Sequence, residues 1–345
     1  MLTVFSERQK LHNPPTEFLG GELVSYFEMP ERVDMVLNSL KTHSIGTVIQ
    51  PESFSLEPIL RVHTPEYVAF LESAWMRWLT TYPESTQAVP YCFPQRGMRS
   101  VLPEQIEGAL GYFSMDMTAP VVAGTWEAIR SSVDCVLTAQ KKVMEGEDSV
   151  FALCRPPGHH ASADVMGGYC YLNNAAIAAQ AFRDQGAAKV AILDVDYHHG
   201  NGTQAIFYDR SDVMFVSIHA DPKQDYPHYL GYADETGEGE GKGFNMNLPL
   251  PINTTGWKEY EQALDKSLEK IDEFIPDYLV VSLGLDTYED DPISFFKIHA
   301  SHYQTMGQQL ASVKCPVLFV FEGGYAVAAL GENTVNVLEG FLDAR

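Results

Sequence analysis

Several ionisable side chains follow one apolar run of the sequence within a few residues. The run KVAILDVD (189–196) continues into YHHGNG, so that Asp194, Asp196, His198 and His199 lie within six positions. Asp196 and His198 are two residues apart, and on an extended strand such side chains lie on the same side. Both can therefore reach one metal ion. A lone Asp-x-His pair is a weak signal, because it is more often a surface feature or a helix cap than a pair of ligands.

A third metal ligand is predicted at the end of another apolar run. Asp286 ends the run DYLVVSLGLD, much as Asp196 ends its own run. Two carboxylates and one imidazole suit zinc, iron(II) or manganese(II), and three protein ligands leave a coordination position for water, as in catalytic sites. The sequence therefore predicts a catalytic metal site at Asp196, His198 and Asp286.

The tandem histidines His159 and His160 follow the turn RPPG. We interpret them as acid and base groups that face this metal. Each imidazole needs an orienting partner, and Asp194 is available for one and Asn201 for the other. Tyr325 ends a further apolar run. Its phenol, with an ordinary pKa of about 10, stays protonated at neutral pH and can donate a hydrogen bond to a developing oxyanion.

These residues follow short apolar runs that are typical of strands buried on both faces of a parallel sheet. Helical patterns lie between the runs, at 173–186, which stops at Gly186, and at 256–275. The alternation predicts a doubly wound α/β fold, in which ligand sites lie beyond the carboxyl ends of the strands. The predicted strands are 149–155, 189–196, 213–220, 277–286 and 315–325.

Residues 79–113 break this alternation. The segment carries four prolines, of which Pro83 is the first and Pro103 the last. A structureless stretch of this length inside a compact domain is uncommon and often functional. We expect an insertion near the active site or an interface and no domain boundary, so that residues 1–345 form a single domain.

Composition limits the partners of the protein. The chain has 345 residues, a formal net charge of −23 and a pI near 4.7. An acidic surface repels nucleic acid and acidic membranes. No run approaches the ~20 apolar residues of a membrane span, and the N-terminus lacks the pattern of a signal peptide. We expect a cytoplasmic protein with no nucleic-acid or membrane partner. The acidic charge fits solubility and steering of a cationic substrate equally well.

Together these motifs resemble the histone deacetylase superfamily, and the resemblance covers nearly the whole chain. It implies the arginase/deacetylase fold, a single α/β domain with a central, mostly parallel sheet of about eight strands flanked by helices. The matching segments are VHTPEYVAFL (62–71), RPPGHHA (155–161), GGYCYLNNAAIAA (167–179), DVDYHHGNGTQAIF (194–207), VSIHA (216–220), SLGLDTYEDDP (282–292) and EGGY (322–325).

The resemblance implies a zinc site. Asp196, His198 and Asp286 match the zinc ligands of the family, with Fe2+ as an alternative metal in the cell. Tyr325 matches the residue that polarises the scissile carbonyl together with the metal.

The same resemblance implies roles for the neighbouring polar residues. His160 matches the general base, with Asn201 behind it, and His159 matches an electrostatic partner or acid paired with Asp194. Asp194 and Ser217, with nearby main-chain carbonyls, match a structural K+ site. Many family members have Asp where this chain has Asn201, which alters how basic His160 can become.

A substrate tunnel is also implied. Tyr169 and Tyr226 match its aromatic walls, and Gly168 lies where its backbone can contact the substrate amide. Ile293 occupies the rim position at which eukaryotic spermidine-type deacetylases carry an acidic gatekeeper.

Within the superfamily the chain is most similar to the bacterial acetylpolyamine amidohydrolases, through segments 14–24, 79–113 and 124–134. The similarity implies a homodimer in which the insertion narrows the tunnel mouth, so that a thin flexible chain enters and a folded protein does not. The candidates for contacting the distal ammonium of a substrate are Glu107, Asp116 and Glu17.

The activity implied by the resemblance is zinc-dependent removal of acetyl groups from small cationic amines, with release of acetate. The expected substrates are acetylputrescine, acetylcadaverine and acetylspermidine. A protein or peptide acetyl-lysine deacetylase is the first alternative, since it shares the same chemistry. A non-catalytic acetyl-amine-binding metalloprotein is the second. A binuclear arginase-type hydrolase is less well supported, because the motifs supply too few ligands for two metals.

Overall fold

Strands and helices alternate along most of the chain in the computed structural model, which describes all 345 residues. The strands are β1 (Leu2–Val4), β2 (Thr16–Leu19), β3 (Glu22–Ser25), β4 (Thr47–Ile49), β5 (Ser149–Ala152), β6 (Val190–Asp194), β7 (Val213–Ala220), β8 (Asn245–Leu250), β9 (Tyr278–Leu283) and β10 (Val317–Phe321). The α-helices are α1 (Glu31–Thr42), α2 (Glu57–Leu60), α3 (Pro65–Thr81), α4 (Ile106–Tyr112), α5 (Thr125–Met144), α6 (Asn174–Asp184), α7 (Asn201–Phe207), α8 (Trp257–Phe274), α9 (Ala300–Leu310) and α10 (Val327–Ala344). Two short 3₁₀ helices are η1 (Glu7–Leu11) and η2 (Gly239–Gly241).

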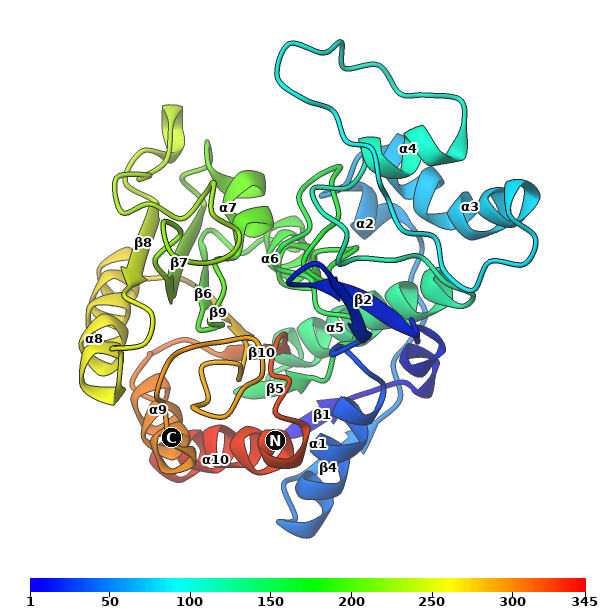
Figure 1. Cartoon of the computed structure of the whole chain (residues 1–345). Coiled ribbons are helices and arrows are strands. Elements are labelled where there is room, and N and C mark those ends of the chain that lie inside the picture. Colours follow the sequence, from blue (N-terminus) through cyan, green and yellow to red (C-terminus); the bar gives the residue numbers. More distant parts are fainter.

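Eight strands form one central sheet (Figure 1). Their order is β4-β1-β5-β10-β9-β6-β7-β8, and every neighbouring pair is parallel. Strands β2 and β3 form a separate antiparallel hairpin. This architecture confirms the predicted single α/β domain with a parallel sheet of about eight strands.

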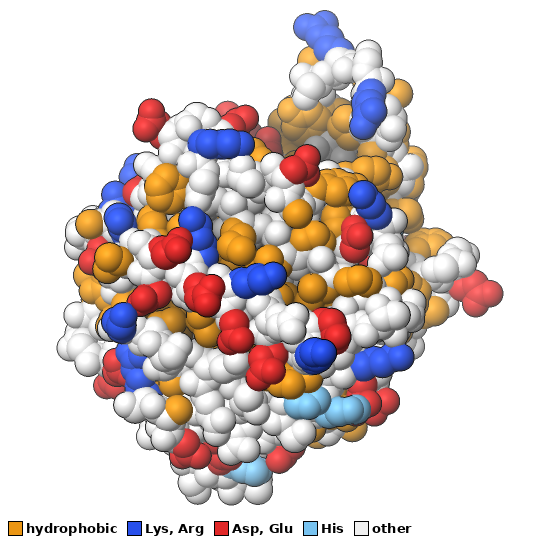
Figure 2. All heavy atoms as spheres, turned by 90° about the vertical axis from the view of Figure 1, so that its left-hand side faces the viewer, with side chains coloured by type: hydrophobic (Ala, Val, Ile, Leu, Met, Phe, Trp, Pro, Cys, Tyr) orange, Lys and Arg blue, Asp and Glu red, His pale blue; other side chains and the backbone are white.

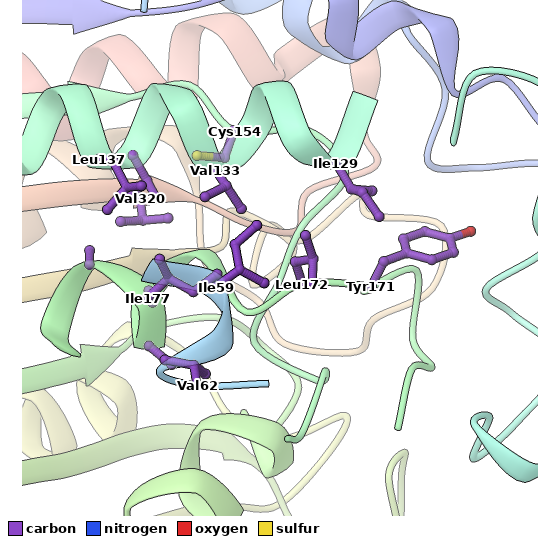
Figure 3. Packing of buried hydrophobic residues seen from close by; sticks show 14 of the residues in the cluster. Ile59, Val62, Ile129, Val133, Leu137, Cys154, Tyr171, Leu172, Ile177 and Val320 are labelled. Carbon is purple, nitrogen blue, oxygen red and sulfur yellow. The ribbon is translucent and has the colours of Figure 1, made fainter. Parts of the chain in front are cut away.

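Helices cover both faces of the sheet. Along β10, Val317, Phe319 and Phe321 enter one hydrophobic core, whereas Leu318 and Val320 enter the other, as the alternation of a strand requires. Helices α3, α5 and α6 pack on the face of Leu318 and Val320, where Val320 meets the side chains shown in Figure 3. Helices α1, α8, α9 and α10 pack on the opposite face. Both faces are therefore closed to water, which explains why the strands are continuously apolar.

All five predicted strands are present, as β5, β6, β7, β9 and β10, and both predicted helices are present, as α6 and α8. Most of the predicted strands extended too far at their carboxyl ends, because the polar residues there belong to loops of the site. Strands β1, β2, β3, β4 and β8 were not predicted. Of these, β1 and β4 are only three residues long, too short for a periodic pattern to be visible.

The insertion is less irregular than its sequence indicated. Helix α3 continues to Thr81 and α4 occupies Ile106–Tyr112, so the irregular part is 82–105. This part projects from the body of the molecule as the long loop beside α4 in Figure 1. Its predicted place near the active-site mouth and a dimer interface stays a prediction.

The surface carries mixed charge on the face seen in Figure 2, where acidic and basic side chains are interspersed and no large patch has one sign. None of the helices combines the length and the apolar character that crossing a membrane requires.

Candidate active site

Four buried carboxylates gather at the carboxyl ends of β6, β9 and β10. Asp194 is the last residue of β6, Asp196 follows two residues later, Asp286 follows β9 and Glu322 follows β10. All four residues are fully buried. Because β10, β9 and β6 are neighbours in the sheet, their ends meet at one edge, as expected for ligand sites of open α/β sheets.

The three predicted metal ligands lie together. Their ligand atoms all fall within 4.8 Å of one another. His198 Nδ1 is 2.9 Å from Asp286 Oδ2 and 3.4 Å from Asp196 Oδ1. Backbone N–H groups hold the carboxylates in place, with Tyr197 donating to Asp286 Oδ1 at 2.8 Å and Gly323 donating to Asp196 Oδ2 at 2.9 Å.

The donor set fits a divalent metal ion. Two buried carboxylates and one imidazole combine charge with nitrogen and oxygen ligands, the combination that zinc and iron(II) accept. Burial, and then the nearby Asp196, raise the pKa of Asp286 to about 7. This shift means that the second negative charge is unfavourable here unless a cation joins the cluster.

The two tandem histidines have different partners. His159 Nδ1 lies 2.9 Å from Asp194 Oδ2, and His160 Nδ1 lies 2.7 Å from Asn201 Oδ1. The two rings are 4.0 Å apart. An amide oxygen can only accept, so Nδ1 of His160 carries the proton and Nε2 is left with a free lone pair. The orientation of the amide follows from its Nδ2, which donates to the carbonyl of His160 at 3.3 Å.

These environments shift the pKa values of the two imidazoles in opposite directions. Burial lowers the pKa of His160 well below its ordinary value, and the charges of His159 and His198 lower it further. Burial also opposes charge on His159, but Asp196 and Asp194 outweigh it and raise the pKa of that ring to about 10. One imidazole is thus neutral and able to accept a proton, while its neighbour is held as a cation.

The pocket above this cluster is small, with a volume of about 160 Å³. Seven of the predicted site residues line it, from the catalytic cluster to the rim. They are His160, Gly168, Tyr169, His198, Tyr226, Ile293 and Tyr325.

Position 168 requires glycine, because a side chain there would clash with the neighbouring residues of the pocket. Its φ is +52°, and a Cβ atom there would lie 2.3 Å from Cδ2 of His160 and 2.9 Å from the hydroxyl of Tyr226. Its N–H donates to Asp116 Oδ2 at 3.1 Å, and the Tyr226 hydroxyl donates to the same oxygen at 2.6 Å. Asp116 therefore braces the pocket wall. The carbonyl oxygen of Gly168 accepts no hydrogen bond from the protein backbone.

Known proteins match this chain over its whole length. The histone deacetylase domain family matches residues 26–341. The chain belongs to the histone deacetylase family.

Relatives with this deacetylase domain include acetylpolyamine amidohydrolase 2 of Pseudomonas aeruginosa, which is 52% identical over 99% of this chain and 98% of the relative. The acetylpolyamine amidohydrolase of Mycoplana ramosa is 46% identical over 99% of both chains. A solved structure, the acetylpolyamine aminohydrolase of Burkholderia pseudomallei, superposes with a TM-score of 0.94 at 38% identity and covers 100% of this chain and 99% of its own.

None of the three predicted acids is a lining residue of the pocket in this deacetylase-family domain, although Asp116 contacts Gly168 and Tyr226 of its wall. Glu107 is on α4, where its carboxylate accepts from the Tyr82 hydroxyl at 2.9 Å. Glu17 is buried on β2 and accepts the N–H of Phe27 at 3.2 Å. Neither of these two acids, nor Asp116, lines the pocket.

Asp225 does line the pocket, and sequence reasoning missed it. Its carboxylate accepts from the Tyr197 hydroxyl and from the N–H of Tyr226. An acidic residue directly before the predicted wall residue Tyr226 was the available signal.

Glu322 has a role that the motif EGGY alone did not reveal. Its Oε2 accepts the N–H of Gly158 at 2.6 Å and of His159 at 3.2 Å. Burial, opposed by the charge of His159, raises the pKa of Glu322 to about 7. The carboxyl therefore fixes the turn that presents the tandem histidines.

The residues predicted for potassium binding are adjacent. Asp194 and Ser217 are paired in register between β6 and β7. Asp194 Oδ1 accepts the N–H of Asp196 at 3.1 Å, and the Ser217 hydroxyl lies 2.8 Å from Nδ1 of His219. Potassium binding here stays a prediction.

A wider groove of about 830 Å³ lies at the opposite, amino end of β9 and β10, between α8 and α9. Its acids have partners of their own, since Asp272 pairs with Lys314 at 2.9 Å and Asp265 accepts from Gln309 at 3.0 Å. It holds no buried carboxylate pair or histidine and offers no comparable chemistry.

Proposed function

We propose that this protein is a metal-dependent amidohydrolase that removes acetyl groups from acetylputrescine, acetylcadaverine and acetylspermidine and releases acetate. The observation that carries the proposal is the buried triad of Asp196, His198 and Asp286 beneath a small pocket that His160 and Tyr325 also line. Relatives named acetylpolyamine amidohydrolase, similar over their full length, support the substrate class.

Zn2+, or Fe2+ in the cell, is the metal that we propose for Asp196, His198 and Asp286. When bound, such an ion polarises the acetyl carbonyl and lowers the pKa of water toward ~7. The three side chains would hold the ion at one edge of the sheet, next to the pocket that His198 lines.

The chain's own groups complete the reaction. Nε2 of His160, which is free because Nδ1 faces Asn201, accepts the proton of the attacking water. The Tyr325 hydroxyl lines the pocket without a hydrogen bond to the protein, and it donates to the developing oxyanion. The carbonyl of Gly168 accepts the substrate amide N–H. The cationic ring of His159 stabilises negative charge, and a protonated histidine then delivers a proton to the leaving amine nitrogen.

The distal ammonium of the substrate has four candidate partners. Asp225 is favoured, because it alone among the candidates lines the pocket, whereas Glu107, Glu17 and Asp116 do not line it. A projecting insertion that turns toward the mouth in a homodimer would bring Glu107 closer, and this is the alternative.

A substrate panel tests the proposed function. Acetylputrescine, acetylcadaverine and acetylspermidine are expected to be turned over faster than an acetyl-lysine peptide, with acetate formed in equal amount to free amine. Preference for the peptide would favour a protein deacetylase. The absence of acetate from every substrate in the metal-loaded enzyme would support the non-catalytic alternative.

Asp225→Asn tests the ammonium contact. The substitution is expected to raise KM for acetylputrescine about tenfold, as for one partly exposed charged hydrogen bond, and to leave N-butylacetamide unaffected. Glu107→Gln is the matched control. If only Glu107→Gln raises KM for the cation, the contact belongs to Glu107.

We also propose a cytoplasmic homodimer with a structural K+ at Asp194 and Ser217. Exposed apolar side chains on segment 82–105 support the dimer, among them Tyr91 and Met98, each 65% exposed. Hydrophobic side chains also gather beneath the projecting segment in Figure 2. Light scattering is expected to give twice the mass of one chain, and exchange of K+ for a non-binding cation is expected to lower thermal stability.

A further inference from the structure

The turn that carries Tyr325 needs an anchor. It follows two glycines, and Gly324 has a φ of +121°, a conformation that few other residues adopt. The hydroxyl of Tyr325 faces the pocket and makes no hydrogen bond within the protein. A reacting group must be held within ~0.5 Å of its working position. Contacts other than those of the hydroxyl must therefore fix it.

Asp291 provides contacts of this kind. It lies in the loop after β9, and only 6% of the residue is exposed. Its Oδ2 accepts the backbone N–H of Tyr325 at 2.7 Å and that of Ala326 at 3.2 Å. Its Oδ1 accepts the N–H of Ile293 at 3.1 Å. No lysine, arginine or histidine forms an ion pair with it.

This arrangement is unusual for a buried carboxylate. Burying such a group is unfavourable unless hydrogen bonds compensate, and here only backbone N–H groups of two loops do so. Hydrogen bonds to a charged acceptor are shorter and roughly twice as strong as neutral ones. One side chain therefore clamps the Tyr325 turn to the loop that carries both the metal ligand Asp286 and the rim residue Ile293.

Arg32 supports the same turn differently. Its guanidinium lies 4.8 Å from the Tyr325 ring centroid, and its Nε donates to the carbonyl of Gly324 at 2.7 Å. Arg32 thus contacts the ring and the preceding residue, whereas Asp291 holds the N–H of Tyr325 itself.

We propose that Asp291 is a positioning residue that holds the Tyr325 hydroxyl in its catalytic orientation by clamping the backbone N–H groups of Tyr325 and Ala326. The inference rests on the proposed function, since it concerns the same reaction.

A double-mutant cycle tests the inference. Asp291→Asn keeps the size of the side chain but replaces one acceptor oxygen by an amide nitrogen. It is expected to lower kcat about 10- to 100-fold with little change in KM, the effect of a misplaced group. Tyr325→Phe alone is expected to lower kcat by ~10²–10³. The double variant is expected to match Tyr325→Phe, because no hydroxyl is left to misplace.

Two controls separate positioning from general damage. Asp290→Asn makes the same chemical change at the exposed neighbouring residue, and it is expected to leave kcat unchanged. Bound metal, measured by elemental analysis, is expected to stay at the wild-type level in Asp291→Asn. Loss of metal, or an equal fold-loss of kcat in the Tyr and Phe backgrounds, would overturn the inference.

Ala326→Pro is the substitute test of the clamp if Asp291→Asn does not fold. The φ of Ala326 is −73°, which proline accepts, and the change removes one of the two N–H groups bound to Oδ2. It is expected to lower kcat less than Asp291→Asn, and only when Tyr325 is present. No change in kcat would count against the clamp.

A failure of the proposed function would give a different pattern of results from a failure of the inference about Asp291. If wild-type enzyme cleaves an acetyl-lysine peptide but no acetylated diamine, the substrate assignment falls, and the cycle still decides about Asp291 on the peptide. If the wild-type enzyme cleaves neither, both proposals fall together.

Discussion

Two buried charge clusters contact the Gly323–Tyr325 turn, and they differ in how many cationic side chains accompany their carboxylates. In the first, Glu28 Oε1 lies 2.9 Å from Nη1 of Arg32 and 2.8 Å from Nε of Arg155, and all three side chains are fully buried. The remaining N–H groups of these arginines reach backbone carbonyls of Gln9, His12, Glu28, Glu322 and Gly324.

The second cluster lacks such cations. Asp194, Asp196 and Asp286 have only His159 and His198 as oppositely charged neighbours. The ligand atoms of Asp196, His198 and Asp286 lie within 4.8 Å of one another, and burial raises the pKa of Asp286 to about 7. A cluster whose carboxylate is matched by its own arginines stabilises the fold, whereas a cluster with more carboxylates than cations favours the binding of a cation. Four predictions test this contrast.

The largest effect is expected from Asp286→Ala. Removing one of three ligands is expected to abolish both bound metal and acetyl-amine hydrolysis, because the remaining two cannot hold the ion in place. Elemental analysis and a turnover assay measure the two losses together. Asp272→Ala removes a surface carboxylate on α8 and is expected to change neither. Full metal content in Asp286→Ala would remove Asp286 from the site.

His160→Ala is expected to lower kcat by ~10²–10⁴, the usual contribution of a general base. The loss is expected to be at least as large as that in His159→Ala, because burial keeps the His160 ring neutral and able to accept a proton, whereas Asp196 and Asp194 hold His159 as a cation. Bound metal is expected to stay at the wild-type level in both variants. Wild-type turnover by His160→Ala would require another residue as the base.

Glu28→Gln tests the cluster of Glu28, Arg32 and Arg155. It leaves two buried arginines without their counter-charge, and breaking a buried ion pair in this way costs about 3–5 kcal/mol of unfolding free energy. Urea unfolding measures the loss, and Glu31→Gln on the exposed start of α1 is the control. A loss of bound metal without a loss of stability would contradict the structural role assigned to this cluster.

The smallest effect concerns Glu17, a buried acid with no cationic partner. Burial raises its pKa from 4.5 to about 7. The folded protein therefore holds this proton up to about pH 7, while the unfolded chain releases it near pH 4.5. The resulting stabilisation is complete below the lower value and is lost as pH rises through the higher one, a change of about 3 kcal/mol.

Glu17→Gln is expected to remove this part of the pH dependence. The urea midpoints of unfolding at pH 5 and pH 8 give the change of stability with pH in the wild type and in the variant. Glu22→Gln on the neighbouring strand is the control. Parallel slopes in the wild type and Glu17→Gln would show that Glu17 is ionised throughout.

Local sequence patterns were sufficient for much of the fold. The apolar runs that became β5, β6, β7, β9 and β10 were recognisable because strands buried on both faces are continuously apolar. Three-residue strands such as β1 and β4 lack such a run. Their place in the sheet depends on pairing partners, with β1 lying between β4 and β5.

Some features of the candidate site were likewise predictable from local sequence, and others were not. The spacing of Asp196 and His198 places both side chains on one side of an extended chain, and that spacing is a local property. The pairing of His160 with Asn201 was also anticipated, and the structure brings the two together. The position of Asp225 at the pocket and of Glu107 away from it depends on loop paths, which local periodicity does not encode.

The sequence was enough to predict candidate site residues and the buried strands, because residue type, spacing and apolar runs are local properties. Which distant groups meet depends on the folded arrangement of the whole chain. Asp291 reaches the N–H of Tyr325 across 34 residues, and Glu322 reaches that of His159 across 163. These contacts exist because β10 lies beside β5 and β9, and β9 beside β6, so that their carboxyl ends share one edge. That strand order results from packing the whole domain, and no single segment of the chain specifies it.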